Sequence, residues 1–395
     1  MCVLANGVAG QWLKTAERAD FGVETTRTAE SILKHGEFRD PFAPIATGPT
    51  AHVAPAYPVL YSAVLAIFGT GKAAWWAIRF LTLAAYALGL ALLPLLAVEL
   101  GLSRRIGVIG ALLGCIVPIP GSCYKWEAIF TGLMLVAMAC ATARLRRLKA
   151  LSNAAALGAV CGLALLFSPV VALVYAAWTV LIWRSLTFKA TLVLAGIPLL
   201  IIFPWLVRNY EVFGTFIFIR DNLGTDLAES NNDCASGWTL DNINSDCFAR
   251  EHPNANLGLA QRIVAIGEYR FNAERLQVAR SWITSHPWQF INLSARRFLF
   301  FWFPAAATVH GLALFGAIIV SLITAASIPG LVLMYRANRL AATMLAAGCL
   351  FYPLANYMIN IDFRYRFPIL WVSCIATAYL LTEIGRKGRP VRLQE

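Results

Sequence analysis

The sequence predicts an all-α integral membrane protein: a polytopic helical bundle with extracytoplasmic juxtamembrane helices and a small extracytoplasmic cap. Of its 395 residues, 59% are hydrophobic and only 14% are charged, and the mean hydropathy is +0.64. A soluble domain is about 45–50% apolar and about 25% charged. So few charges cannot cover a water-exposed surface, and lipid must therefore cover much of this one.

Nine apolar runs are candidate membrane spans, although several are shorter than the usual length of about 17–25 residues. The continuous stretch 153–183 is divided at Ser168-Pro169, because proline breaks a helix and the basic flanks at both ends require two crossings. The runs are 74–99, 106–120, 127–143, 153–168, 169–183, 190–207, 312–334, 340–358 and 367–384.

Basic residues are divided unequally between the two sides of these spans. The connections and the tail on one side hold fourteen, whereas the short connections on the other side hold three. Positively charged loops stay in the cytoplasm, so the first side is predicted to be cytoplasmic. The net charge of +12 thus indicates membrane orientation and not nucleic-acid binding. The fourteen are Arg104, Arg105, Arg144, Arg146, Arg147, Lys149, Arg184, Lys189, Arg336, Arg339, Arg386, Lys387, Arg389 and Arg392, and the three are Lys125, Arg364 and Arg366.

This orientation places two long segments outside the membrane. The first holds an amphipathic stretch from Glu24 to His35 and an aromatic run from Tyr57 to Phe68 that is expected in the interface. The second is polar, with helices expected near 257–284 and 287–300. The predicted division is 1–13 as a partial or truncated first span, 14–73 as the first outer loop, 74–207 as six spans, 208–311 as the cap, 312–384 as three spans and 385–395 as a cytoplasmic tail.

Charged residues are nearly absent from the predicted spans, where a charge at mid-depth costs about 2.5–3.5 kcal/mol. Only Arg79 lies more than a turn from a boundary, near the outer end of its span. Without a row of buried acids or histidines, a proton relay or ion-coupled transport at the membrane centre is not expected. The function should therefore be found at the outer surface.

Four polar motifs lie where the predicted spans meet the outer side. Three have ordinary explanations: a surface ion pair for Glu24 and Arg27, dipole capping for Glu127, and a snorkelling arginine in the third motif. In the fourth, Arg364 and Arg366 oppose the positive-inside trend, which favours a functional role. The motifs are Val23-Glu24-Thr25-Thr26-Arg27-Thr28-Ala29-Glu30, Tyr124-Lys125-Trp126-Glu127, Pro204-Trp205-Leu206-Val207-Arg208-Asn209-Tyr210 and Asp362-Phe363-Arg364-Tyr365-Arg366-Phe367-Pro368.

Together the motifs bring two acids and at least three arginines to one membrane interface. Guanidinium groups bind phosphate oxygens through two parallel hydrogen bonds, and an isolated carboxylate near them can accept a proton from a hydroxyl. This combination suits a transferase whose donor is a sugar on a lipid phosphate. A nucleotide-sugar donor is not expected, because the sequence lacks a soluble nucleotide-binding domain.

At these residues the sequence resembles the GT-C superfamily of polyprenyl-phosphate-sugar-dependent glycosyltransferases. Within it, the sequence is similar to the family of protein O-mannosyltransferases and the lipid A aminoarabinose transferase, glycosyltransferase family 39. Two departures stand out: the first full helix before the acid is missing or truncated, and Ala54-Pro55 replaces a common Lys-Pro. The matching residues are Glu24, Arg27, Ala29 and Glu30, the segment from Thr47-Gly48-Pro49-Thr50-Ala51 to Tyr57-Pro58, Arg208-Asn209-Tyr210 with Phe213-Gly214, and Arg364-Tyr365-Arg366-x-Pro368.

The resemblance implies an inverting transfer with roles for individual residues. Glu24 would accept the proton of the acceptor hydroxyl, and Glu127 would orient acceptor or sugar, or assist the base. His52 is a candidate substitute for the absent lysine, although a lone loop histidine is more often structural. The implied donor-phosphate contacts are Arg27, His52, Arg208, Arg364 and Arg366, and the implied substrate-cavity residues are Tyr57, Asn209 and Tyr365.

No cofactor is identified, and a divalent metal is not indicated, because no His/Cys/Asp cluster has ligand spacing. The histidines are scattered along the sequence, at His35, His52, His252, His286 and His310.

Seven of the nine cysteines fall into two groups. Cys234 and Cys247 lie 13 positions apart in the predicted outer cap. An oxidising compartment would allow a disulfide between them, worth about 3 kcal/mol. Five others lie in predicted spans and are interpreted as small apolar residues: Cys115, Cys140, Cys161, Cys349 and Cys374.

The expected partners are a polyprenyl-phosphate-linked sugar donor, a lipid, glycan or protein acceptor, and membrane lipids, with no nucleic acid. The expected location is a bacterial inner membrane, with the active site on the periplasmic side. Two other functional classes stay open. A lipid-linked sugar flippase or polymerase would be favoured by internal repeats or polar lumen-lining helices, and a non-catalytic membrane subunit would tolerate loss of Glu24 and Glu127.

Overall fold

The computed structural model describes residues 23–304, 307 and 311–387. These residues are mostly helical, and the β-structure among them consists of two isolated bridges. The expectation of an all-α membrane fold is confirmed. The predicted partial span at 1–13 lies outside the described residues, as does most of the tail.

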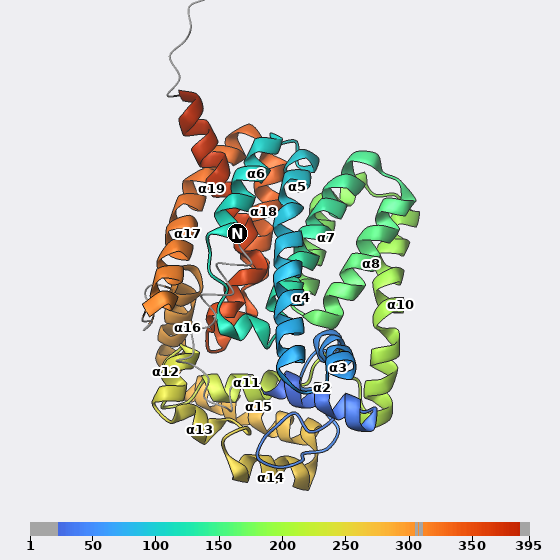
Figure 1. Cartoon of the computed structure of the whole chain (residues 1–395), viewed down its shortest axis with the longest axis vertical. Coiled ribbons are helices and arrows are strands. Elements are labelled where there is room, and N and C mark those ends of the chain that lie inside the picture. Colours follow the sequence, from blue (N-terminus) through green and yellow to red (C-terminus); the bar gives the residue numbers. More distant parts are fainter. Residues whose placement is uncertain (1–22, 305–306, 308–310, 388–395) are drawn as a thin grey trace, which may run out of the picture.

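Ten of the helices in the described part of the chain form an upright bundle (Figure 1). Within the described residues, six stretches are long and apolar enough to cross a membrane: Lys72–Glu99, Ala128–Leu148, Phe188–Phe213, Ala313–Ala337, Arg339–Met358 and Phe363–Arg386. The other three predicted runs are also helical but form shorter helices. The bundle helices are α4 Lys72–Ala91, α5 Leu93–Glu99, α6 Arg104–Cys115, α7 Ala128–Leu148, α8 Leu151–Phe167, α9 Val171–Ile182, α10 Phe188–Phe213, α17 Gly311–Ala337, α18 Arg339–Phe351 and α19 Phe367–Lys387.

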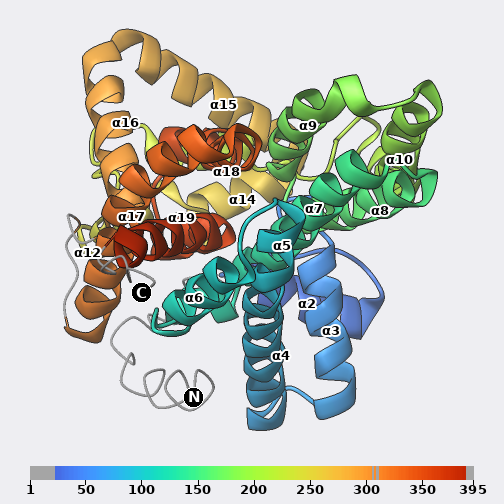
Figure 2. The same ribbon diagram turned by 90° about the horizontal axis from the view of Figure 1, so that it is seen from above.

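Helix α7 lies in the middle of the bundle. It packs against α4, α8 and α19 and lies between α8 and α19 when the molecule is seen from above (Figure 2). Close helix contact depends on small residues, as is usual where lipid removes the hydrophobic drive for association. Gly330 of α17 is one such position, because a Cβ there would overlap the backbone of Ala376 in α19.

The remaining helices gather at one end of the bundle (Figure 1). They come from the two segments that the charge distribution assigns to the outer side, and we refer to residues 215–302 as the cap. The pair expected from the sequence, Cys234 and Cys247, is joined by a disulfide within the cap. The helices are α2 Glu24–His35, α3 Ala56–Phe68, α11 Leu223–Ser230, α12 Thr239–Asn244, α13 Cys247–Glu251, α14 Leu257–Ile266, α15 Glu268–Ser285 and α16 Pro287–Trp302.

The segment between α2 and α3 is held between bundle and cap by buried polar contacts. From the bundle, Arg208 donates to the carbonyls of Phe38 and Thr50 at 3.0 and 2.8 Å. From the cap, Glu268 accepts hydrogen bonds from the Thr50 hydroxyl at 2.6 Å and from the Ala51 amide at 2.7 Å. These bonds fix the first outer loop against both parts of the molecule.

A buried arginine joins α16 to α11 and to the turn Ala355–Met358, which follows α18. Arg297 is fully buried and donates to the carbonyls of Ser230 and Met358 and to the side-chain oxygen of Asn231. Removing a donor from buried acceptors leaves each of them without compensation for lost water. Arg297 is therefore expected to contribute strongly to the attachment of the cap.

We predict that Arg297→Met lowers the stability of the protein by about 3 kcal/mol, because the buried oxygens of Ser230 and Asn231 lose their donor, while the Met358 carbonyl keeps the hydrogen bond from Asn231 Nδ2. Thermal unfolding in detergent measures the effect. The neighbouring Arg296 is exposed, and Arg296→Met serves as the matched control with little change. Equal melting temperatures for the two variants would contradict the assignment.

Candidate functional site

A cavity of about 330 Å³ lies at the junction of the bundle and the cap. Its bundle wall is made of helix ends, namely the start of α7, the break between α8 and α9, the end of α18, and the turn before α19. Its cap wall is made of α11 and the loop after α13, with the start of α2 beside them. Helix ends carry polar groups that lipid cannot solvate, so this boundary is where charged side chains can be accommodated.

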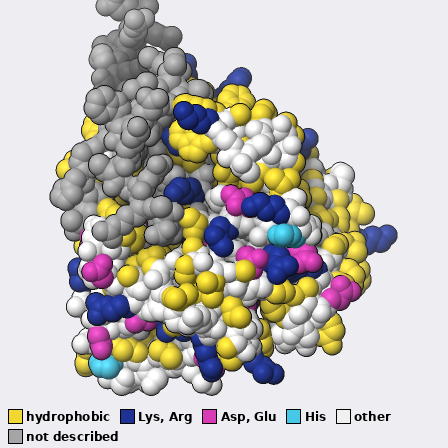
Figure 3. Space-filling model, turned by 60° about the horizontal axis from the view of Figure 1, so that its bottom comes forward, with side chains coloured by type: hydrophobic (Ala, Val, Ile, Leu, Met, Phe, Trp, Pro, Cys, Tyr) yellow, Lys and Arg dark blue, Asp and Glu magenta, His cyan; other side chains and the backbone are white. Residues whose placement is uncertain are grey.

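Charged side chains gather on the cap end of the molecule. Figure 3 shows a histidine among basic and acidic side chains near the middle of the face that comes forward, with hydrophobic side chains over much of the rest. The cavity is lined by four acids, two arginines and two histidines: Glu24, Glu127, Asp226, Glu229, Arg220, Arg364, His52 and His252.

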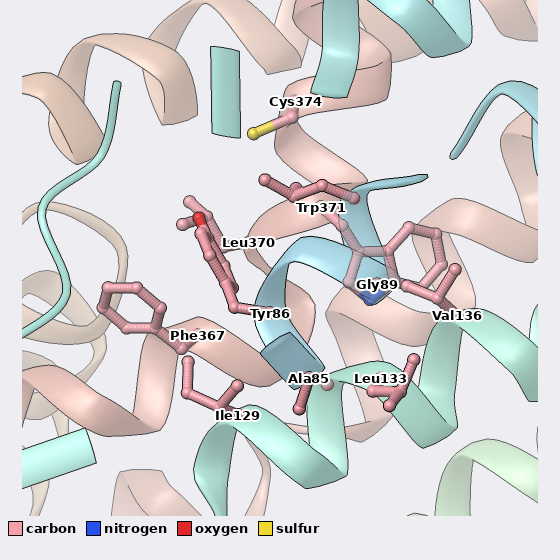
Figure 4. A pocket seen from close by; sticks show the side chains of 12 residues that line it. Ala85, Tyr86, Gly89, Ile129, Leu133, Val136, Phe367, Leu370, Trp371 and Cys374 are labelled. Atoms are coloured by element: carbon pink, nitrogen blue, oxygen red, sulfur yellow. The ribbon is translucent and has the colours of Figure 1, made fainter. Parts of the chain in front are cut away.

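A second pocket, between α4, α7 and α19, has no charged lining (Figure 4). Its volume is about 20 Å³, room for a single water-sized group, and its walls are residues such as Tyr86, Phe367 and Trp371. The hydroxyl of Tyr86 already donates to the carbonyl of Gly114 at 2.8 Å. This pocket offers no acid–base chemistry, and we therefore place the candidate site in the larger cavity.

Glu24 is the first residue of α2 and is only 4% exposed. Burial raises the pKa of its carboxyl to about 7. Its Oε1 accepts a hydrogen bond from Asn254 Nδ2 at 2.6 Å, whereas its buried Oε2 has no hydrogen-bond partner. The Ala43 amide donates to Asn254 Oδ1 and so fixes the orientation of that amide group. Glu24 thus has one oxygen that is held and one that is available for a proton.

His252 stands beside Glu24 in the loop after α13. Its Nδ1 accepts a hydrogen bond from the backbone N–H of Asn254 at 3.1 Å, which places the ring proton on Nε2. Nε2 lies 3.5 Å from Glu24 Oε1 and 3.8 Å from Glu229 Oε2. Burial lowers the pKa of His252 to about 3, so these are contacts of a neutral N–H with carboxyl groups and not ion pairs.

Helix α11 adds two acids that the sequence analysis missed. Asp226 and Glu229 are three positions apart and face the same cavity. Burial raises the pKa of Asp226 to about 6 and that of Glu229 to about 8. In the sequence, these acids could have been noticed from their spacing, which places both on one face of a short helix in the cap. Local spacing alone did not indicate that this helix would approach Glu24.

Two arginines line the cavity. Arg364 lies in the turn Phe363–Arg366, with its guanidinium 4.1 Å from the centre of the Trp126 ring and donating to the Tyr365 hydroxyl at 3.1 Å. Arg220, also missed in the sequence, donates from Nε to the His52 carbonyl at 3.0 Å. Its NH1 group lies 3.4 Å from Glu127 Oε1.

Of the residues expected from the sequence, the cavity brings together Glu24, His52, Glu127, Arg364 and Tyr365. Five others do not line it. Arg27 donates to the Asp40 carbonyl, Arg208 holds the first outer loop, and Asn209 donates to the Ile217 carbonyl. Tyr57 donates to the Tyr124 carbonyl, and Arg366 is buried against the Thr324 and Ser373 hydroxyls.

The fold also brings together a carboxylate and two histidines that are far apart in the sequence. Glu24, His52 and His252 are all buried, and one ligand atom from each lies within 4.8 Å of the others. Neutral imidazoles and a carboxylate are common donors for divalent metals. Two of the histidines that looked scattered in the sequence therefore form, with Glu24, a group of metal-ligand type. Long-range folding created it, which is why residue spacing gave no signal.

Comparison with known proteins gives matches among solved structures only. No family model matches the sequence, and no curated protein does. The oligosaccharyltransferase of Archaeoglobus fulgidus, in complex with Zn and sulfate, aligns with a TM-score of 0.53 and 17% identity. The same organism's oligosaccharyltransferase AglB, with an inhibitory peptide and a dolichol-phosphate, aligns with a TM-score of 0.53 and 15% identity.

The two alignments cover 93% and 94% of this chain but only 45% and 48% of the archaeal chains. The chain has the GT-C fold. The expected resemblance to GT-C glycosyltransferases is thereby confirmed for the fold. This chain spans less than half the length of the archaeal GT-C enzymes. ArnT from Cupriavidus metallidurans, bound to undecaprenyl phosphate, aligns at 12% identity over 93% of this chain and 73% of its own, with a TM-score of 0.39.

We predict that Asn254→Ala raises the pKa of Glu24 above about 7, because the lost hydrogen bond favours the ionised carboxyl. Carbodiimide reacts with protonated carboxyl groups, so the pH of half-labelling at Glu24, read by mass spectrometry, reports this pKa. Asn244→Ala, at an exposed asparagine of α12, is the control. A half-labelling pH that stays the same in Asn254→Ala would refute the role of this bond.

Proposed function

We propose that this protein is a membrane glycosyltransferase that moves a sugar from a polyprenyl phosphate to an acceptor hydroxyl. The observation that carries the proposal is the cavity itself, which joins a buried carboxyl with an available oxygen, Glu24 Oε2, to two arginines. The GT-C fold supports the reaction class. AglB, which shares this fold, has been observed with a dolichol-phosphate, and this supports a lipid phosphate as the donor group.

In the proposed reaction, the acceptor oxygen attacks the anomeric carbon of the sugar from the side opposite the phosphate. The bond between this carbon and the phosphate oxygen breaks, and its electron pair leaves with the lipid phosphate. The proton of the acceptor hydroxyl moves to Glu24 Oε2. One bond forms and one breaks on opposite sides of the same carbon, so the anomeric configuration inverts.

The pKa of Glu24 suits this role. A general base works best when its pKa is close to the operating pH, since it must be ionised and still basic enough to hold the proton. Burial brings the pKa of the Glu24 carboxyl to about 7. Asn254 would keep the base oriented through Oε1 while Oε2 faces the acceptor.

Positive charge for the departing phosphate would come from Arg364, whose guanidinium is held by the Trp126 ring and the Tyr365 hydroxyl. A lipid phosphate monoester is a good leaving group once its charge is stabilised, so no acid is needed on that side. Arg27, Arg208 and Arg366 were expected to share this contact. We propose that Arg208 acts indirectly, by holding the loop that carries His52.

The side of the membrane is assigned by charge. The cap and the first outer loop lie opposite the connections that carry most of the basic residues, and this favours an extracytoplasmic site. In a bacterial cell this would be the periplasmic face of the inner membrane. A lipid-linked donor fits such a site, because nucleotide sugars are not expected outside the cytoplasm.

We predict that Glu24→Gln lowers kcat by about 10²–10⁴-fold, because glutamine keeps the shape of the side chain but cannot accept a proton. In the unaltered protein, kcat/KM should rise with pH through about 7, as the Glu24 carboxyl ionises. Arg364→Ala should mainly weaken donor binding, since the base stays in place. The assay uses purified protein in lipid vesicles with polyprenyl-phosphate sugars.

Two outcomes of this assay would contradict the proposal. Near-normal turnover in Glu24→Gln would return Glu24 to a structural role and refute its assignment as the base. Transfer from a UDP- or GDP-sugar without any lipid carrier would refute the donor class. Glu30→Gln, at a half-buried acid on the same helix, serves as the matched control with normal turnover.

A divalent metal fits the same cavity by its donor set. Glu24, His52 and His252 would hold it, and it would supply positive charge beside the leaving phosphate. The unpartnered Glu24 Oε2 and the low pKa values of both buried histidines, which keep the rings neutral, are compatible with ligation. The hydrogen bond at His252 Nδ1 opposes it, because it leaves the proton on Nε2.

We predict that transfer continues after treatment with EDTA, because Arg220 and Arg364 already bring fixed positive charge to the cavity. The measurement compares turnover before and after chelation, with metal content followed by mass spectrometry. The prediction is wrong if EDTA abolishes turnover and added Zn²⁺ or Mn²⁺ restores it in the unaltered protein but not in His52→Ala. The metal would then be required.

A further inference from the structure

Arg220 and Glu127 form an ion pair on the wall of the cavity. Arg220 lies in the linker between α10 and α11, and Glu127 directly precedes α7. Their closest atoms, Arg220 NH1 and Glu127 Oε1, are 3.4 Å apart, and each side chain keeps 17% of its surface exposed. Charge-assisted N–H···O bonds are usually about 2.7–2.9 Å long. The pair is therefore loose and reachable from the cavity.

The guanidinium of Arg220 is oriented by a separate contact. Its Nε donates to the backbone carbonyl of His52 at 3.0 Å, so the group stays in place even when the carboxylate moves. The backbone supports this position, since the amide of the next residue, Asp221, donates to the carbonyl of Ala51 at 2.8 Å. An arginine fixed through Nε presents its terminal nitrogens to whatever anion is in front of them.

Among the described residues, Arg220 and Arg364 are the arginines that line this cavity. Each contacts one of two consecutive residues before α7. The Trp126 ring packs against Arg364, and the Glu127 carboxylate pairs with Arg220. A phosphate and a carboxylate are recognised by the same terminal edge of a guanidinium. Glu127 thus occupies a position that suits a phosphate oxygen.

We infer that Arg220 binds the phosphate of the lipid donor and that Glu127 is the internal anion that the phosphate displaces. This inference rests on the proposed function, since it assigns the phosphate position of the same site. The displaced carboxylate stays at the start of α7, where the helix dipole stabilises a negative charge. It is then free to accept a hydrogen bond from a sugar hydroxyl.

The inference makes opposite predictions for the two partners. Glu127→Gln removes the competing anion and should tighten binding of a polyprenyl phosphate without sugar by about two- to fivefold, the range expected for a partly exposed ion pair. Arg220→Ala should weaken binding by about tenfold or more. In the double variant, Glu127→Gln should have no further effect, because the site for which it competes is gone.

The experiment measures binding of a short-chain polyprenyl phosphate to the full-length protein in lipid nanodiscs, without turnover. Arg262→Ala and Glu274→Gln are matched controls, since this pair joins α14 and α15 on the exposed surface of the cap. Arg220→Lys keeps the charge and should bind more weakly than the unaltered protein but better than Arg220→Ala. Thermal unfolding of each variant checks that it is folded.

Weaker or unchanged binding in Glu127→Gln would overturn the inference, whether or not the Arg220 variants fold. Binding that Arg220→Ala leaves intact would also overturn it. If the unaltered protein binds no polyprenyl phosphate, the proposed donor class itself fails. A failure of the Arg220–Glu127 assignment is therefore distinguishable from a failure of the proposed function.

Discussion

Desolvation of the Glu24 carboxyl is the constraint on which the rest of the site depends. A buried carboxylate loses its water, and the surrounding groups must either keep it neutral or replace the lost hydrogen bonds. Here the replacement is partial. Asn254 serves Oε1 while Oε2 has no partner, and the pKa of the group settles at about 7. This incomplete compensation leaves a carboxyl that can exchange a proton near neutral pH.

The environment of Glu24 exists only when the cap sits on the bundle. Glu24 comes from the first outer loop, Asn254 from the cap, and Arg364 from the turn before α19. Glu268 and Arg208 fix the first loop from opposite sides, and Arg297 attaches α16 to its neighbours. The buried polar contacts outside the cavity therefore hold in place the ones that line it. Substitutions in both sets of residues should alter activity. Substitutions outside the cavity should do so mainly by lowering stability.

Much of the fold was predictable, because helices in lipid are specified by local apolar runs and by their basic flanks. The expected break at Ser168-Pro169 separates α8 from α9. Residues beside helix starts, such as Glu24 and Arg364, were also found, since short motifs mark them. Asp226, Glu229 and His252 were missed because they reach the cavity only through contacts between distant segments. Arg366 has the motif expected of a site residue, yet its side chain points into the packed bundle.

The central claim is that one cavity holds both the base and the lipid phosphate. A structure of the protein with a bound, non-hydrolysable polyprenyl-phosphate sugar tests it most directly. The account predicts the phosphate against Arg220 and Arg364, with the face of the anomeric carbon opposite the phosphate turned toward Glu24 Oε2. A lipid phosphate bound outside this cavity, or a sugar whose anomeric carbon faces away from Glu24, would contradict it.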